Sequence, residues 1–150
     1  MAEAWIFEPN DEVKGGAVAA QAAFAHLDWL RPIPRHFLHV WLLGVAIPEF
    51  AARVPLELEY ARVNCFHSAV VVEVRAPDLS ALHPEPTFLP HMTIAVTTES
   101  HDPEPLRKAL LPLRKRPFGR DQATNAKRIS FPAGRSTLFE PWTVVETVPE

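Results

Sequence analysis

The sequence contains a single cysteine, Cys65, among its 150 residues. One cysteine forms neither an internal disulfide nor a multi-cysteine metal site, so we expect a reducing compartment, the cytoplasm. Glycine is scarce too, with five residues, and no glycine-rich loop of the dinucleotide or nucleoside triphosphate type occurs. No apolar run approaches the ~18 residues that a membrane-spanning helix requires. These absences exclude the common nucleotide-loop enzymes and predict a chain without membrane contact.

The composition has no strong bias, with 47% hydrophobic and 22% charged residues. A chain of this length buries roughly 68–70% of the surface that it exposes when unfolded, so we expect one domain over residues 1–150. The charge is uneven, because residues 1–100 hold 6 basic and 12 acidic residues and residues 101–150 hold 9 and 6. This distribution permits an anionic ligand near the C-terminal third, although charged runs more often form solvated faces.

Hydrophobic patterns and proline breaks predict a mixture of strands and helices. The expected strands are 4–8, 35–44, 56–63, 68–76, 91–97, 125–133 and 142–148, and the expected helices are 11–30 and 102–115, the second shortened or kinked by Pro112. The order suggests a crude duplication into two halves. It predicts an α+β fold with antiparallel sheets and helices outside rather than a doubly wound parallel sheet.

Each half carries a histidine at the same point of an apolar, strand-like run: RHFLHVWLLG at 35–44 and LPHMTIAV at 89–96. Side chains alternate between the two faces of a strand, so His39 shares a face with Trp41, and His91 shares one with Thr93. Imidazoles titrate near 6.5 before any perturbation, so a facing pair can hold one neutral base and one charged acid. A threonine two residues along would direct its hydroxyl at the same anion.

These segments resemble the H-x-[ST] motifs of the two-histidine (2H) phosphoesterase superfamily, in the branch of 2′-5′ RNA ligase-like proteins and cyclic phosphodiesterases. PHMTIAV matches the second motif, and the closing EPWTVVETVP resembles the final strand. The resemblance implies a bilobed fold around a central groove. It also implies chemistry on 2′,3′- or 1″,2″-cyclic phosphates or RNA 2′,5′ linkages, without metal or cofactor. His39 and His91 would be acid and base, and Thr93 would bind a non-bridging phosphoryl oxygen.

The first motif departs from the family pattern, because Trp41 stands where the family has Thr or Ser. Loss of one preorganised hydrogen-bond donor costs about 2.7–4 kcal/mol in other enzymes. An indole can instead stack on a nucleobase, which is worth about 1–3 kcal/mol. Two alternatives to an enzyme follow: a nucleotide- or RNA-binding module of the same fold, and a protein-interaction domain whose histidines are structural.

Basic residues are the remaining candidates for phosphate contact. We expect Arg35, Lys127, Arg128 and Arg135 to bind the substrate, a nucleotide or an RNA end. The run RKRPFGR, residues 114–120, is a further candidate for an RNA backbone. Cys65 is interpreted as a small buried apolar residue. The other histidines are given no role, and His36 is placed on the strand face opposite His39.

Overall fold

The computed structural model describes residues 1–66, 68–85, 87–99, 101–134 and 137–150. The elements in chain order are β1 Ala2–Phe7, α1 Asp11–Ala22, β2 Leu30–Pro32, η1 Arg35–Phe37, β3 Val40–Trp41, α2 Ile47–Arg53, β4 Leu56–Phe66, β5 Ala69–Arg75, α3 Pro77–Ser80, β6 His91–Thr97, α4 Glu104–Leu110, η2 Leu111–Leu113, β7 Gly119–Ala123, β8 Ala126–Phe131 and β9 Thr143–Val148. The labels η1 and η2 denote 3₁₀ turns.

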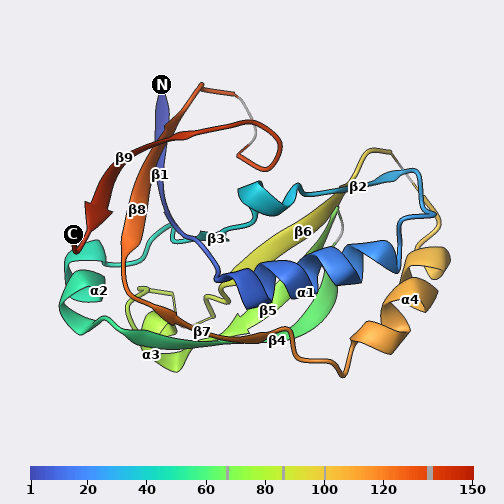
Figure 1. Cartoon of the computed structure of the whole chain (residues 1–150), viewed down its shortest axis with the longest axis horizontal. Helices are drawn as coiled ribbons and strands as arrows, with labels where there is room; N and C mark the ends of the chain where they lie inside the picture. Colours follow the sequence, from blue (N-terminus) through green and yellow to red (C-terminus); the bar gives the residue numbers. More distant parts are fainter. Residues whose placement is uncertain (67, 86, 100, 135–136) are drawn as a thin grey trace.

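The described strands join in one curled sheet in the order β7-β4-β5-β6-β3-β1-β8-β9, with β2 added beside β6. Every strand pair in it is antiparallel. The short β3 lies at the middle, between β6 of one half and β1 of the other (Figure 1). The α+β fold with antiparallel strands is therefore confirmed, and the strands of the two halves are hydrogen-bonded into a single sheet.

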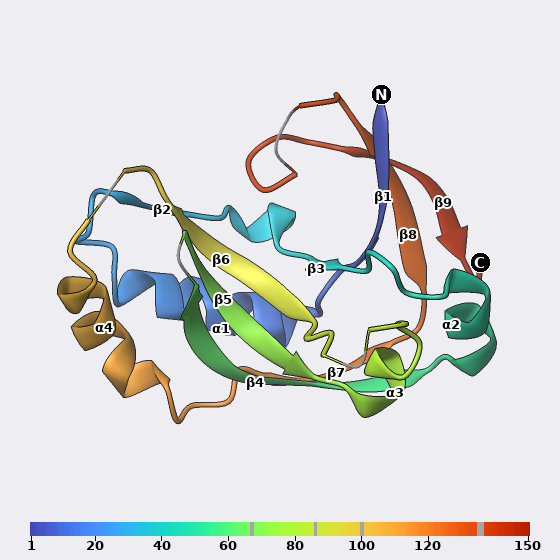
Figure 2. The same ribbon diagram turned by 180° about the vertical axis from the view of Figure 1, so that it is seen from behind.

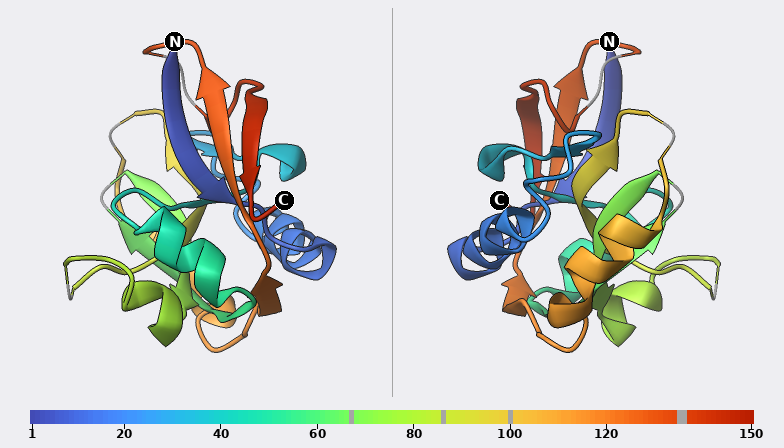
Figure 3. Two further views of the ribbon diagram at one scale, coloured as in Figure 1. Left: turned by 90° about the vertical axis from the view of Figure 1, so that its left-hand side faces the viewer. Right: turned by 90° about the vertical axis from the view of Figure 1, so that its right-hand side faces the viewer.

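Helices cover only part of this sheet. The helix α1 packs across one face of β4, β5 and β6, and in the view from behind these strands lie in front of it, with the short helix α3 beside the start of β4 (Figure 2). Strands β1, β8 and β9 lie side by side and turn away from β4, β5 and β6 (Figure 3). The helix α4 lies at the end of the sheet where β6 finishes. Within the described residues, no helix is long and apolar enough to span a membrane.

Burial follows the alternation that the two histidine segments predict. Leu38, Val40 and Leu42 are buried, and so are Met92 and Ile94 on the neighbouring strand β6. These side chains join the hydrophobic core under α1. The opposite face of the same two strands is therefore left for the polar residues of the motifs.

The predicted strand 35–44 is wrong over most of its length. Only Val40–Trp41 is a strand, and Arg35–Phe37 forms a 3₁₀ turn. The amide of Phe37 donates to the carbonyl of Pro34 at 2.9 Å, so local hydrogen bonds replace the ladder that an extended chain would need. The placement of His36 by strand alternation fails with it, because His36 lies in that turn.

Helix lengths also differ from the expectation. The helix predicted over 11–30 ends at Ala22, because the chain then turns to bury Phe24 and Leu27 in the core. The helix predicted over 102–115 is α4, Glu104–Leu110, followed by the 3₁₀ turn that contains Pro112. Arg114 and the basic residues after it therefore lie beyond the helix. The structure also contains β2, α2 and β7, which the sequence patterns do not predict.

Candidate active site

The register between β3 and β6 places the two motifs against each other. Val40 pairs with Met92 in the antiparallel ladder. One residue further in each direction brings His39 opposite Thr93 and Trp41 opposite His91, on the face away from the core. The Val40–Met92 pair is thus the local centre of symmetry, and each histidine lies opposite the third residue of the other H-x-[ST] segment.

These four residues line one cavity of about 430 Å³. Its remaining lining comes from the C-terminal segments: Phe131, Thr137 and Leu138. The end of β8, at Phe131, and the residues Thr137 and Leu138 therefore form the part of the cavity wall that β3 and β6 do not supply. The structure brings together the predicted His39, His91, Thr93 and Trp41, and it adds three residues from the C-terminal third.

His39 is 5% exposed and is held by its backbone neighbour. Its Nδ1 lies 2.7 Å from the carbonyl oxygen of Phe37. A carbonyl only accepts, so Nδ1 carries the proton and Nε2 has a free lone pair in the neutral ring. Burial lowers the pKa of His39 below 6.5, although the Phe37 carbonyl and the charge of Glu8 partly oppose this effect. At neutral pH His39 is therefore uncharged and its Nε2 is an acceptor.

His91 has the same support but a different environment. Its Nδ1 lies 3.2 Å from the carbonyl oxygen of Leu89, again two residues earlier in the chain. The side chain is half-buried, and the ring of Phe66 packs edge-on against it with 5.6 Å between centroids. Both histidines thus donate through Nδ1 to the backbone, which leaves both Nε2 atoms for chemistry.

Aromatic rings pack around His39, one from β3 and others from the C-terminal part of the chain. The centroid of Trp41 lies 5.9 Å from the His39 ring and 6.4 Å from the Phe131 ring. Trp142 contacts His39 edge-on at 5.2 Å. These rings contribute to the burial of His39. Trp142 and Phe131 are functional candidates that sequence reasoning missed, because Phe131 stands in no motif and the closing segment that contains Trp142 predicts only a strand.

Thr137 is another residue that sequence reasoning missed. Its side chain is buried, with 7% exposure, and its Oγ1 lies 3.4 Å from Nε2 of His39. Since Nδ1 of His39 carries the proton, the Thr137 hydroxyl is the donor in this contact. The cavity therefore contains two threonine hydroxyls, from Thr93 and Thr137, although Trp41 contributes none. No pattern in the sequence links Thr137 to the histidine strands.

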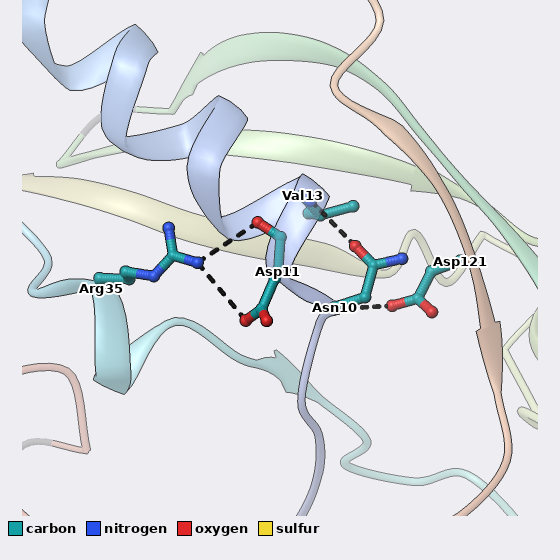
Figure 4. Close-up of polar contacts among 5 residues, drawn as sticks. All are labelled: Asn10, Asp11, Val13, Arg35 and Asp121. Atoms are coloured by element: carbon teal, nitrogen blue, oxygen red, sulfur yellow. Dashed lines mark hydrogen bonds and ion pairs between the residues drawn. The ribbon is translucent and has the colours of Figure 1, made fainter.

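The basic residues expected to bind substrate lie elsewhere. Arg35 reaches the start of α1 and pairs with Asp11 at 3.4 Å (Figure 4). Lys127 pairs with Glu8, and Arg128 pairs with Glu3. None of these three lines the cavity of the histidines. Arg135 lies outside the described residues, and the substrate-binding roles of all four stay predictions.

Two further expectations concern cysteine and metals. Cys65 is exposed at the end of β4, so its interpretation as a buried apolar residue is wrong. Its neighbour Phe66 ends the strand at the turn into β5, where the sheet offers no cover. Among the described residues, no group of three or more His, Cys, Asp or Glu side chains is placed to hold a metal ion.

Comparison with known proteins identifies a fold. No family model and no curated protein sequence matches the chain. The structure of TT0787 of Thermus thermophilus matches with a TM-score of 0.69 and 17% identity, over 99% of this chain and 97% of that one. The structure of E. coli LigT with phosphate matches with a TM-score of 0.63 and 16% identity, over 97% and 94%. A protein described as a phosphoesterase also matches, with a TM-score of 0.63 and 16% identity, over 97% of this chain and 95% of that one.

The chain therefore has the LigT-like α+β fold, a curled antiparallel sheet with few helices. This is the fold expected from the two histidine segments. Sequence identities of 16–17% reach no further than the fold.

Proposed function

We propose that this protein is a phosphoesterase that uses two histidines as acid and base on a 2′,3′-cyclic phosphate or a 2′,5′-linked nucleotide or RNA. One observation carries the proposal: His39 and His91 line one cavity, and each holds Nδ1 against a carbonyl two residues earlier, which leaves both Nε2 atoms for a ligand. The fold comparison supports the substrate class, since structures of E. coli LigT contain phosphate or 3′-AMP.

His39 is the base in this proposal. Its burial keeps the ring neutral, and its Nε2 lone pair faces the cavity. In hydrolysis of a cyclic phosphate, Nε2 takes a proton from water while the water oxygen forms a bond to phosphorus. A positioned base of this kind typically contributes about 10²–10⁴-fold to the rate.

His91 is the acid. Its Nδ1 proton is donated to the Leu89 carbonyl, and the acid role requires a second proton on Nε2. As the bond from phosphorus to one ribose oxygen breaks, Nε2 of His91 gives its proton to that oxygen. The product is a phosphomonoester with one new hydroxyl. His39 is left protonated and His91 neutral, and exchange with solvent restores both.

The two threonine hydroxyls stabilise the charge that develops on the phosphoryl oxygens. Thr93 stands opposite His39 in the strand register, and Thr137 already donates to Nε2 of His39. When a phosphate displaces that contact, both hydroxyls can donate to non-bridging oxygens. Thr137 thus supplies from the β8–β9 connection a donor that the first motif lacks.

Trp41 favours a second candidate function, binding without turnover. Its half-buried indole lies in the cavity at the position symmetric to Thr93, where it can stack on a base. Quenching of tryptophan fluorescence by a nucleoside 2′- or 3′-phosphate, with no product from the cyclic substrate, would favour this function over the enzyme.

The test is hydrolysis of nucleoside 2′,3′-cyclic phosphates in the presence of a chelator. We expect turnover by the wild type and a loss of about 10²-fold or more in His39→Gln and in His91→Ala. His26→Ala is the matched control, because His26 is exposed outside the cavity. Thermal unfolding of each variant separates loss of chemistry from loss of fold. Equal turnover by wild type and His91→Ala would refute the acid role.

A further inference from the structure

A second cavity, of about 670 Å³, lies at the end of the sheet beside α4. It forms where the β4–β5 turn, the end of β6 and the segment around α4 meet, and it is larger than the cavity of the histidines. Side chains that can contact a polar ligand line it: Ser68, Thr97, Thr98, His101, Arg107 and Arg114.

The charged side chains of this cavity are mostly basic. Arg107 and Arg114 line it together with His101, and Glu99 is the carboxylate among the described lining residues. Arg107 contacts Glu104 at 3.3 Å, but both side chains are more than half exposed, so this pair is weak and its arginine is available. Arg114 has no ion pair with any other described residue.

Cys65 lines this cavity together with the two arginines. Partial burial raises the pKa of its thiol, and the charges of Arg107 and Arg114 both act to lower it. Two guanidinium groups, one on α4 and one just after the following 3₁₀ turn, therefore line the same cavity. An anion in the cavity would feel the same two charges.

Phe66 connects this cavity with the histidines. Its ring lines the second cavity, and its edge packs on His91, which lines the first. The ring is 41% exposed, so it is accessible to a flat ligand that enters the cavity. Strand β6 also runs from one cavity to the other, with Thr93 in the first and Thr97 in the second.

A ligand that suits both cavities is long, carries several negative charges and has flat apolar groups. Arginine binds phosphate through paired hydrogen bonds, and an exposed aromatic ring stacks on a base without regard to sequence. We infer that the second cavity binds the phosphate backbone of a single-stranded RNA whose reactive end lies between His39 and His91. This inference rests on the proposed function and adds to it a second binding site, for the part of an RNA substrate beyond the reactive end.

The kinetic test compares two substrates that share one reactive group. One is a nucleoside 2′,3′-cyclic phosphate, and the other is a short single-stranded RNA that ends in the same group. We expect kcat/KM for the RNA to exceed that for the mononucleotide by about 10-fold or more. In the double variant Arg107→Ala, Arg114→Ala this ratio should fall toward one.

The matched control is Lys108→Ala, Lys115→Ala, which removes two charges from the neighbouring positions of the same segment. Lys108 and Lys115 are exposed and do not line the cavity. We expect this variant to keep the ratio. An equal fall in both double variants would show a general charge effect and overturn the inference, and so would a wild-type ratio near one.

A binding measurement separates this inference from the proposed function. Fluorescence anisotropy follows a labelled short RNA with a 3′-phosphate, which needs no turnover. We expect binding that weakens with salt, with a slope that is smaller in Arg107→Ala, Arg114→Ala by about 0.7 for each phosphate that the variant no longer neutralises. If no cyclic phosphate is hydrolysed but the RNA binds in this way, only the enzyme proposal fails. If the RNA does not bind, or a poly-glutamate peptide binds as well, the inference fails.

Discussion

At the scale of single residues, the two histidines share a support and differ in environment. Both direct Nδ1 at the carbonyl two residues earlier, but His39 is buried under aromatic rings and His91 is half-buried beside Phe66. The burial of His39 lowers its pKa and favours its neutral form. The sequence alone made the histidines equivalent, whereas their surroundings favour His39 as the base.

The pH dependence of activity tests that assignment. The base must be neutral, and burial lowers the pKa of His39 below 6.5. As the pH falls, the loss of kcat/KM for a cyclic phosphate that comes from protonation of His39 should therefore begin only below 6.5. The acid limb of the pH–rate profile measures this, with circular dichroism as the check that the fold survives. An acid limb at or above 6.5 would contradict the role of His39.

Thr137 leads to a second prediction at this scale. The substitution Thr137→Val keeps the shape of a buried side chain and removes its hydroxyl. Loss of one preorganised donor lowers kcat by about 10²–10³-fold in other enzymes, and we expect a fall of that order, with a smaller change in KM. Thr137→Ser, which retains the hydroxyl, should keep most of the activity. If both variants change the stability but their kcat values do not differ, Thr137 has a packing role and is not a hydrogen-bond donor in catalysis.

At the scale of elements, the site depends on how each segment begins and ends. Asn10 stands before α1, and its Oδ1 accepts from the amide of Val13 at 2.9 Å (Figure 4). Its own backbone amide donates to Asp121 on β7 at 2.8 Å. One residue therefore caps the helix that covers the sheet and fixes that helix to the strand at the far end of the sheet.

Asn10→Ala should destabilise the protein by about 0.5–2 kcal/mol, because an uncapped helix leaves amides without acceptors. The hydrogen bond from the backbone amide of residue 10 to Asp121 remains in this variant. The loss of stability therefore measures the contribution of the Asn10 side chain. Asn10→Ser retains an acceptor and should lose clearly less. Urea unfolding monitored by tryptophan fluorescence measures both values. Equal stability of Asn10→Ala and wild type would refute the capping role.

At the scale of the whole molecule, one sheet runs through both halves. The halves meet at β3 and β6, where Val40 pairs with Met92 directly behind the cavity. Both of these side chains are fully buried. A sheet that is continuous through its centre leaves the halves no boundary at which to separate, so the single domain expected over residues 1–150 should unfold as one unit.

Met92→Ala tests this cooperativity. Removal of the buried side chain and the cavity left behind should cost about 2–5 kcal/mol, and the substitution lies where the halves meet. We expect one calorimetric transition in both wild type and variant, with the variant's Tm lower and the calorimetric enthalpy equal to the van't Hoff enthalpy. Two resolved transitions in either protein would show that the halves are separate folding units.

The sequence by itself determined the strand 91–97, the α+β class and the buried face of the histidine segments. The strand and its buried face follow from alternation within a short stretch of chain. The class follows from the number and order of the strands along the whole sequence. His39, Trp41, His91 and Thr93 could be nominated in the same way, because the two motifs are read within a few residues each. The shortening of the second helix at Pro112 is equally local.

Only the tertiary structure decided what surrounds those residues. Thr137, Phe131 and Trp142 reach the site from far along the chain, and no periodicity marks a contact of that kind. The ion pairs that occupy Arg35, Lys127 and Arg128 depend in the same way on which strands become neighbours. Burial of His39, and with it the sign of its pKa shift, is a property of the packed whole. Desolvation arises from every atom around the ring, whereas the sequence specifies only the ring and its neighbours along the chain.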